Sequence, residues 1–144
     1  VSIEYEDVDF VAEGVKITVT KSKTDQTGIG LTKAIPYFEN QTFCPVISLK
    51  KWIEYSNINI GKIFKVSDKT VALTIKKYAL IAGLDNSKYA GHSLRSGFAT
   101  STADIGADER SIMAMTGHKT TQMVRRYIRE ANIFKNNALN KIKI

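Results

Sequence analysis

The sequence has few of the residues that build cross-links and metal sites. It contains one cysteine, Cys44, and two histidines in 144 residues. A single cysteine excludes an internal disulfide and fits a reducing compartment, and this small set makes a structural zinc site unexpected. No apolar run approaches the roughly 20 residues of a membrane-spanning helix, and the first ten residues lack a basic-then-apolar targeting pattern. These absences favour a cytoplasmic globular protein of one domain.

Acidic residues are outnumbered by basic ones. Lysine and arginine total 21 against 14 aspartates and glutamates, which gives a net charge of +7 and a pI near 9.5. The acids gather near the start of the chain, and the bases dominate later. A basic surface attracts polyanions and binds phosphates without regard to sequence. Charge alone leaves a nucleic-acid binder and an ordinary solvated basic protein equally open.

Hydrophobic periodicity predicts strands first and helices afterwards. Alternation over 14–20 and 31–37 predicts a β-hairpin with a long polar tip, and 1–3 suggest a short third strand. A 3.6-residue period with capping residues predicts the helices that follow. Their expected ranges are 45–56, 67–82, 92–106, 108–116 and 120–131. The fold class is therefore mainly α with a small antiparallel sheet at the N-terminal end (α+β).

The apolar positions of these helices predict which faces are buried. In the first helix these are Val46, Leu49, Ile53 and Trp52. In the second they are Val71, Ile75, Tyr78, Ala79 and Ala82. In the third they are Leu94, Phe98, Thr102 and Ile105.

A histidine and an arginine three residues apart begin the third helix. His92 and Arg95 lie on one helix edge, because residues at i and i+3 are neighbours. An arginine can direct two N–H donors at phosphate oxygens, and a histidine can exchange a proton near neutral pH. Alone, this pair is weak evidence, since a capping histidine beside a surface arginine is more common.

A second histidine and a tyrosine follow further along the chain. His118 lies at a helix–helix turn, and Tyr127 comes nine residues later on the next helix. Periodicity alone places Tyr127 with Val124 on an apolar face, as a core tyrosine. Arg125 and Arg126 point away from that face. A phenol beside cations is well placed to meet a phosphate, although the ordinary tyrosine pKa near 10 leaves it protonated at pH 7.

These residues carry a resemblance to a known family. The string GHSLRSGFATSTADIGADERSIMAMTGHKTTQMVRRYI resembles the C-terminal signature of the tyrosine recombinases, the phage integrase family. In that family an HxxR helix precedes a GH turn and then a nucleophilic tyrosine, at the spacings of His92, Arg95, His118 and Tyr127. The hairpin VKITVTKSKTDQTGIGLTKAIP is similar to the family's hairpin, whose tip carries a catalytic lysine. Lys23 is our choice for that lysine. The resemblance covers residues 1 to about 131.

The resemblance implies the catalytic-domain architecture of that family and a phosphoryl transfer that needs neither metal nor cofactor. Tyr127 would attack the scissile phosphate, forming a 3′-phosphotyrosyl enzyme and releasing a 5′-hydroxyl. Arg95 would stabilise the charged transition state. His92 would assist proton transfer, and His118 would hydrogen-bond the phosphate. Lys23 would protonate the leaving oxygen.

The partner implied is double-stranded DNA in the cytoplasm of a bacterium or phage host. Strand exchange in this family implies a homo-oligomer, a tetramer on DNA, in the full-length protein. The residues expected to contact DNA are Lys21, Lys119, Thr120, Arg125 and Arg126. Lys21 is also the alternative to Lys23 as the catalytic lysine.

One departure from the family pattern concerns a second phosphate-binding arginine. The family places it ahead of the hairpin in an RxxE-type motif, whereas this sequence has no arginine before Arg95. We expect residues 1–144 to form a single catalytic domain whose arginine motif and core-binding domain lie upstream in a longer chain. Loss of one transition-state donor costs roughly 10²–10³ in rate, so slow cleavage is expected. The tail over 132–144 is expected to dock on a neighbouring protomer.

Three other interpretations stay open. Residues 108–131 also resemble a helix-turn-helix, so the chain is alternatively a non-catalytic DNA-binding protein in which Tyr127 is a core residue. A type IB topoisomerase would share the chemistry, but the chain length and spacing disfavour it. A degenerate recombinase remnant would keep the motifs without activity. Nothing in the sequence identifies the DNA target, or separates integration from excision, inversion or dimer resolution.

Overall fold

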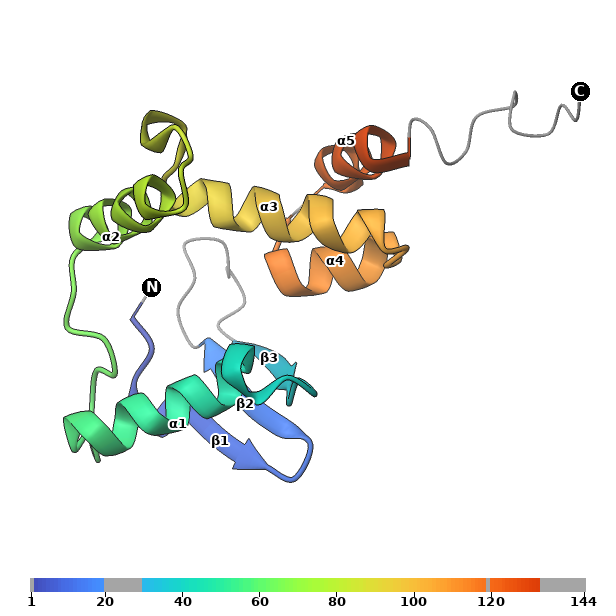
Figure 1. Cartoon of the computed structure of the whole chain (residues 1–144). Helices are drawn as coiled ribbons and strands as arrows, with labels where there is room; N and C mark the ends of the chain where they lie inside the picture. The colour runs from blue at the N-terminus through green and yellow to red at the C-terminus, as the bar shows by residue number, and fades with distance from the viewer. Residues whose placement is uncertain (1, 20–29, 119, 133–144) are drawn as a thin grey trace, which may run out of the picture. The chain divides into compact units, whose positions relative to one another are not determined.

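The computed structural model describes residues 2–19, 30–118 and 120–132 (Figure 1). Two compact units make up the chain, one ending at Lys65 and the other beginning at Val66. Within the described residues, no helix is long and apolar enough to cross a bilayer.

The first unit is a three-stranded antiparallel sheet followed by a helix. Its elements are β1 (Val8–Val11), β2 (Gly14–Val19), β3 (Leu31–Pro36) and α1 (Pro45–Ser56), with short 3-10 turns at Tyr5–Asp7 and Gln41–Phe43. In β2, Val15 and Ile17 are buried while Lys16 between them is exposed, as the two-residue period of a strand requires. These two side chains pack with Cys44 and Val46 into the core of this unit.

The predicted hairpin is confirmed, but the third strand is not where the sequence placed it. Strand β1 occupies Val8–Val11 and pairs with β2 through a two-residue turn, with Val11 opposite Gly14. Ile3 instead accepts a backbone hydrogen bond from Ile63 at 3.1 Å, so the start of the chain pairs with the connector after α1. Gly14 lets β2 and β3 approach each other closely, because a Cβ at this position would lie 2.1 Å from the carbonyl oxygen of Ile35 on β3.

The second unit is helical. It contains α2 (Asp68–Ile81), a 3-10 turn at Asn86–Lys88, α3 (Gly91–Asp104), α4 (Glu109–Thr116) and α5 (Thr121–Asn132). The predicted helix limits agree with these to within about two residues, because the ends carry local signals. Ser67 caps α2 by accepting from the Thr70 N–H, and Asp108 caps α4 by accepting from two backbone N–H groups. The α+β class is confirmed.

Helices α3, α4 and α5 pack against one another around a core of small and branched side chains (Figure 1). Ala99 and Ala103 of α3 are buried, and they pack with Ile112 of α4 and Val124 of α5. Small residues on α3 let the two other helices approach it closely. This alanine face holds α5, and therefore Tyr127, against α3.

The predicted buried face of α3 is wrong. Leu94 is 61%, Phe98 41% and Ile105 83% exposed, and Thr102 is half-buried. The helix carries apolar residues on two faces, and the partners pack on the alanine face because it allows the shorter interhelical distance. Periodicity counts apolar residues but does not record how closely a partner can approach.

The expected faces of α1 and α2 are confirmed in part. In α1, Val46 and Ile53 are buried and Leu49 is half-buried, but Trp52 is 41% exposed and donates its indole N–H to the Ile63 carbonyl oxygen at 3.0 Å. In α2, Ala79 is buried and Ile75 is half-buried. The other members of that stripe, Val71, Tyr78 and Ala82, are exposed.

Candidate active site

The phenol of Tyr127 on α5 reaches α3. Its hydroxyl lies 3.1 Å from the hydroxyl of Ser96, within hydrogen-bond distance, and either oxygen can be the donor. The ring is half-buried and packs against the alanine-lined core of the second unit. Tyr127 is thus a packed side chain whose polar end is held beside α3, so the core and functional interpretations do not exclude each other.

His118 lies next to this tyrosine, just after α4 ends. Gly117 ends the helix with a left-handed backbone (φ 68°), which turns the chain so that His118 follows the last helical turn. The His118 side chain is only 8% exposed, and its ring centroid is 6.0 Å from that of Tyr127. The two side chains therefore share one edge of the α4–α5 junction.

A threonine hydroxyl fixes the His118 tautomer. Thr116 Oγ1 lies 2.7 Å from the Ile112 carbonyl oxygen and 2.7 Å from His118 Nδ1. A carbonyl oxygen can only accept, so the single hydroxyl proton of Thr116 goes to Ile112. Thr116 Oγ1 then accepts from Nδ1–H of His118. In the neutral ring, Nε2 is left as an acceptor.

The charge environment of His118 includes the predicted catalytic arginine. Burial, and after it the positive charge of Arg95, lower the pKa of His118 below its ordinary value. Both causes disfavour the imidazolium form. Arg95 on α3 is therefore near enough to His118, which follows α4, for its charge to lower the pKa of that histidine.

His92 and Arg95 occupy the first turns of α3. Both side chains are exposed, as groups that meet an external phosphate must be. Ser96 follows Arg95 directly and lies one turn after His92 on the same face. The α3 start, the turn after α4 and the middle of α5 thus supply Arg95, His118 and Tyr127 from within one unit.

The predicted DNA contacts fall into two groups. Arg125 is exposed on α5, and its Nε donates to Glu109 Oε2 at 3.1 Å, so this cation already has a carboxylate partner on α4. Arg126 and Thr120 are also exposed. Lys21, Lys23 and Lys119 lie outside the described residues, so the choice between Lys23 and Lys21 stays a prediction.

Two side chains at the site were not predicted from the sequence. Ser96 is 31 residues from Tyr127 along the chain, and its neighbour Arg95 offered the only signal for it. Thr116 is two residues before His118, but its contact depends on how Gly117 turns the backbone. Within the described part of the chain, no group of three histidine, cysteine, aspartate or glutamate side chains could hold a metal ion.

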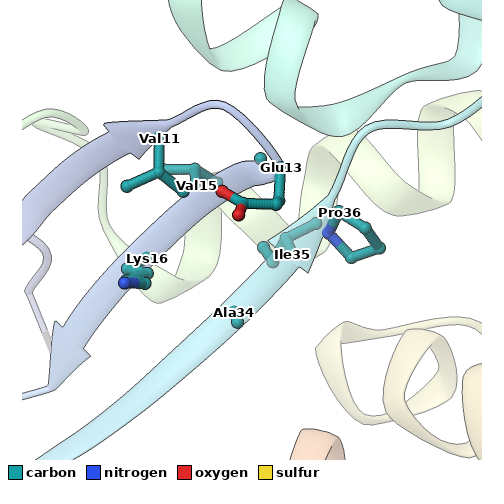
Figure 2. A pocket seen from close by; sticks show the side chains of 8 residues that line it. Val11, Glu13, Val15, Lys16, Ala34, Ile35 and Pro36 are labelled. Atoms are coloured by element: carbon teal, nitrogen blue, oxygen red, sulfur yellow. The ribbon is translucent and has the colours of Figure 1, made fainter.

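A hollow elsewhere in the molecule lacks this chemistry. Figure 2 shows it on the sheet of the first unit, lined mainly by apolar side chains of β1, β2 and β3. Its charged members are Glu13 and Lys16. It contains none of the predicted site residues.

Comparison with known proteins identifies the family of this site. The model of the phage integrase family matches residues 1–132. The chain belongs to the phage integrase family. The expected family is thereby confirmed, and the match extends over the sheet as well as the helices.

Curated relatives agree with this assignment. An "Integrase/recombinase xerD homolog" from Selenomonas ruminantium is 47% identical over 154 residues, which cover 99% of this chain and 45% of the relative. A "Tyrosine recombinase" from Pseudothermotoga lettingae is 27% identical over 98% of this chain and 47% of its own length. "Tyrosine recombinase XerD" from Proteus mirabilis is 42% identical over 41% of this chain and 20% of its own length. The chain thus spans less than half the length of these relatives. No solved structure gives a significant match.

Proposed function

We propose that this integrase-family chain carries out site-specific DNA recombination through a covalent 3′-phosphotyrosyl intermediate. The observation that carries the proposal is the Tyr127 hydroxyl, held 3.1 Å from Ser96 directly after Arg95 on α3. His118, 6.0 Å from Tyr127 between ring centroids, supplies a second polar group at the same place. The family membership and the recombinase relatives support the same reaction class.

The proposed step is a transesterification in which bonds and protons balance. The phenol oxygen of Tyr127 forms a bond to phosphorus, and the bond from phosphorus to the 5′-oxygen breaks. The phenol proton leaves to a nearby acceptor, and the 5′-oxygen takes up a proton as it departs. The phosphotyrosyl bond retains the energy of the broken phosphodiester, so rejoining needs no ATP.

The surrounding cations would stabilise this transfer. Arg95 would bind non-bridging oxygens through two N–H groups, where negative charge develops. Lys23 would protonate the leaving 5′-oxygen, with Lys21 as the alternative. His92 would assist proton transfer around the nucleophile. The proposal gives no role to a metal ion or cofactor.

His118 would hydrogen-bond the phosphate only after it gains a proton. Its neutral ring donates through Nδ1 to Thr116, which leaves Nε2 without a hydrogen. A phosphate near the ring would favour the imidazolium, because an opposite charge stabilises the charged form. We therefore propose that His118 takes up a proton as the scissile phosphate binds, and then donates from Nε2.

The partners follow from the same proposal. Double-stranded DNA is the substrate, with Arg125, Arg126, Lys119, Thr120 and Lys21 as the proposed contacts. Exchange of strands between two duplexes requires four nucleophiles, so we propose a tetramer on DNA for the full-length protein.

The decisive test traps the covalent adduct. The substrate is a pool of nicked duplexes with a randomised central segment, from which the short 5′-hydroxyl strand diffuses away after cleavage. We expect this chain to become attached to DNA during long incubation, and Tyr127→Phe to bind the pool without attachment. The trapped strands are recovered with denatured protein and sequenced, which also yields the preferred site.

The alternative function is a non-catalytic helix-turn-helix binder. It is favoured by α4, which ends at Gly117, and by α5, which leaves Thr121 and Gln122 exposed at its start, with Thr120 exposed just before it. A binder would retain DNA but form no adduct with either protein. Absence of any adduct from the unmodified chain would contradict the recombinase proposal.

A further inference from the structure

The hydroxyl of Ser96 contacts the proposed nucleophile directly. Ser96 Oγ and the Tyr127 hydroxyl are 3.1 Å apart across the α3–α5 interface. The hydrogen bond is partly buried, so water competes for it less than at an exposed site. Without this contact, rotation about the χ1 bond would sweep the phenol oxygen through an arc, whereas rotation of the ring about χ2 leaves the oxygen on the axis of rotation.

The position of Ser96 on α3 gives this contact a function. Arg95 precedes it, and His92 lies four residues earlier on the same face, one turn away. Both are exposed at the start of the helix. The hydrogen bond between the phenol and Ser96 therefore fixes the nucleophilic oxygen relative to the residues that would bind and surround the phosphate.

The apolar packing around the Tyr127 ring positions the ring, and the contact with the Ser96 hydroxyl then positions the phenol oxygen. The Tyr127 ring packs against the cluster of Ala99, Ala103, Ile112 and Val124, which fixes the plane of the side chain at its base. That cluster has no polar group to hold the oxygen. A serine hydroxyl can both accept from a phenol and donate to a phenolate, so the contact can persist while the proton departs.

We propose that Ser96 is a positioning residue for Tyr127, which holds the phenol oxygen where it can attack a phosphate bound at Arg95. The inference rests on the proposed function and adds to it a residue that acts through the nucleophile. Misplacing a reacting oxygen lowers the rate without changing how the DNA is held.

The test separates the chemical step from DNA binding. Ser96→Ala removes the hydroxyl, and Ser96→Thr restores one at the same place. The substrate is the nicked duplex with the preferred sequence that the trapping experiment recovers. At saturating concentrations of this duplex, we expect the single-turnover rate of adduct formation to fall about three- to tenfold in Ser96→Ala, the rate equivalent of one neutral hydrogen bond. Ser96→Thr should recover most of the rate, and DNA affinity should stay the same in both.

A matched control lies on the same helix. Ser101 is exposed, and the described residues offer its side chain no hydrogen bond. Ser101→Ala should form adduct at the unmodified rate. A rate for Ser96→Ala equal to that of Ser101→Ala would overturn the inference, as would a loss explained entirely by weaker DNA binding.

A second measurement needs no DNA cleavage. Urea unfolding midpoints are compared for Ser96→Ala, Tyr127→Phe and the double variant. If the two hydroxyls hydrogen-bond to each other, the double variant should lose less stability than the sum of the losses in the two single variants. Additive losses would overturn the hydrogen bond itself. An unmodified chain that forms no adduct, with coupled midpoints, would instead contradict the proposed function and leave the contact standing.

Discussion

At the scale of single residues, the site is controlled by short side chains beside the conspicuous ones. Thr116 decides which nitrogen of His118 carries the hydrogen, and Ser96 holds the oxygen of Tyr127. Neither serine nor threonine stands out in a sequence, because these residues are common at caps and turns. Their roles depend on contacts that only the folded backbone creates.

The buried histidine makes stability depend on pH. Burial, and then Arg95, lower the pKa of His118 below 6.5, while the unfolded chain titrates near that ordinary value. The unfolded state therefore binds more protons just below pH 6.5, so the free energy of unfolding should fall as the pH drops through this window. Above about pH 7.5 both states are neutral at this residue, and the dependence should vanish.

Urea unfolding at about pH 7.5 and about pH 5.5 checks this prediction. His118→Gln should show a smaller loss at the lower pH than the unmodified chain. Arg95→Met should reduce the loss without removing it, because burial is the larger cause. The carboxyls of Asp85 and Asp108 also have a lowered pKa, set mainly by hydrogen bonds from Ser87 and Ser111, but they act below about pH 4. An equal loss in His118→Gln would contradict the assignment.

At the scale of elements, helix ends were predictable, whereas the buried face of α3 was not. Ser67 and Asp108 cap helices with their own side chains, and Gly117 takes the left-handed backbone that ends α4. These signals act within a few residues, so the sequence contains them in full. The buried face of α3 depends instead on which surface lets α4 and α5 approach, and the alanines decided it against Leu94 and Phe98.

The alanine face of α3 should be intolerant of larger side chains. Ala99 is fully buried, so Ala99→Leu must push α4 or α5 away from α3. We expect a stability loss of about 1–3 kcal/mol, typical of overpacked cores. Because Tyr127 is carried on α5, adduct formation should fall further than the fraction of unfolded protein explains.

A leucine placed elsewhere on the same helix provides the comparison. Ser101→Leu adds the same side chain at an exposed position, and should leave both stability and adduct formation almost unchanged. Thermal unfolding and the adduct assay at a temperature where both variants are folded make the measurement. Full adduct formation by folded Ala99→Leu would show that the α3–α5 distance does not position the nucleophile.

At the scale of the whole molecule, the order of the motif residues carried more information than any one of them. His92, Arg95, His118 and Tyr127 were predicted together from the family resemblance that their order and spacing carry, and Arg95, His118 and Tyr127 do come from elements of one unit. The contact of Ser96 with Tyr127 joins positions 31 residues apart. Such a contact depends on the packing of α5 against α3, and local sequence patterns do not encode it.

The net charge of +7 makes a further prediction about DNA binding, in which local contact and overall charge can be separated. Each phosphate contact contributes about 0.9 to the slope of log affinity against log salt concentration. Arg125→Ala and Lys77→Ala remove the same single charge, but only Arg125 is a proposed DNA contact, whereas Lys77 is exposed on α2. We expect Arg125→Ala to lower the slope by about 0.9 and Lys77→Ala to leave it nearly unchanged. Binding is measured by fluorescence anisotropy over a series of salt concentrations.

Since Arg125 must also leave Glu109 to meet a phosphate, Glu109→Gln should strengthen binding at low salt. Equal slopes for the two alanine variants would mean that overall charge, not contact through α5, sets the affinity.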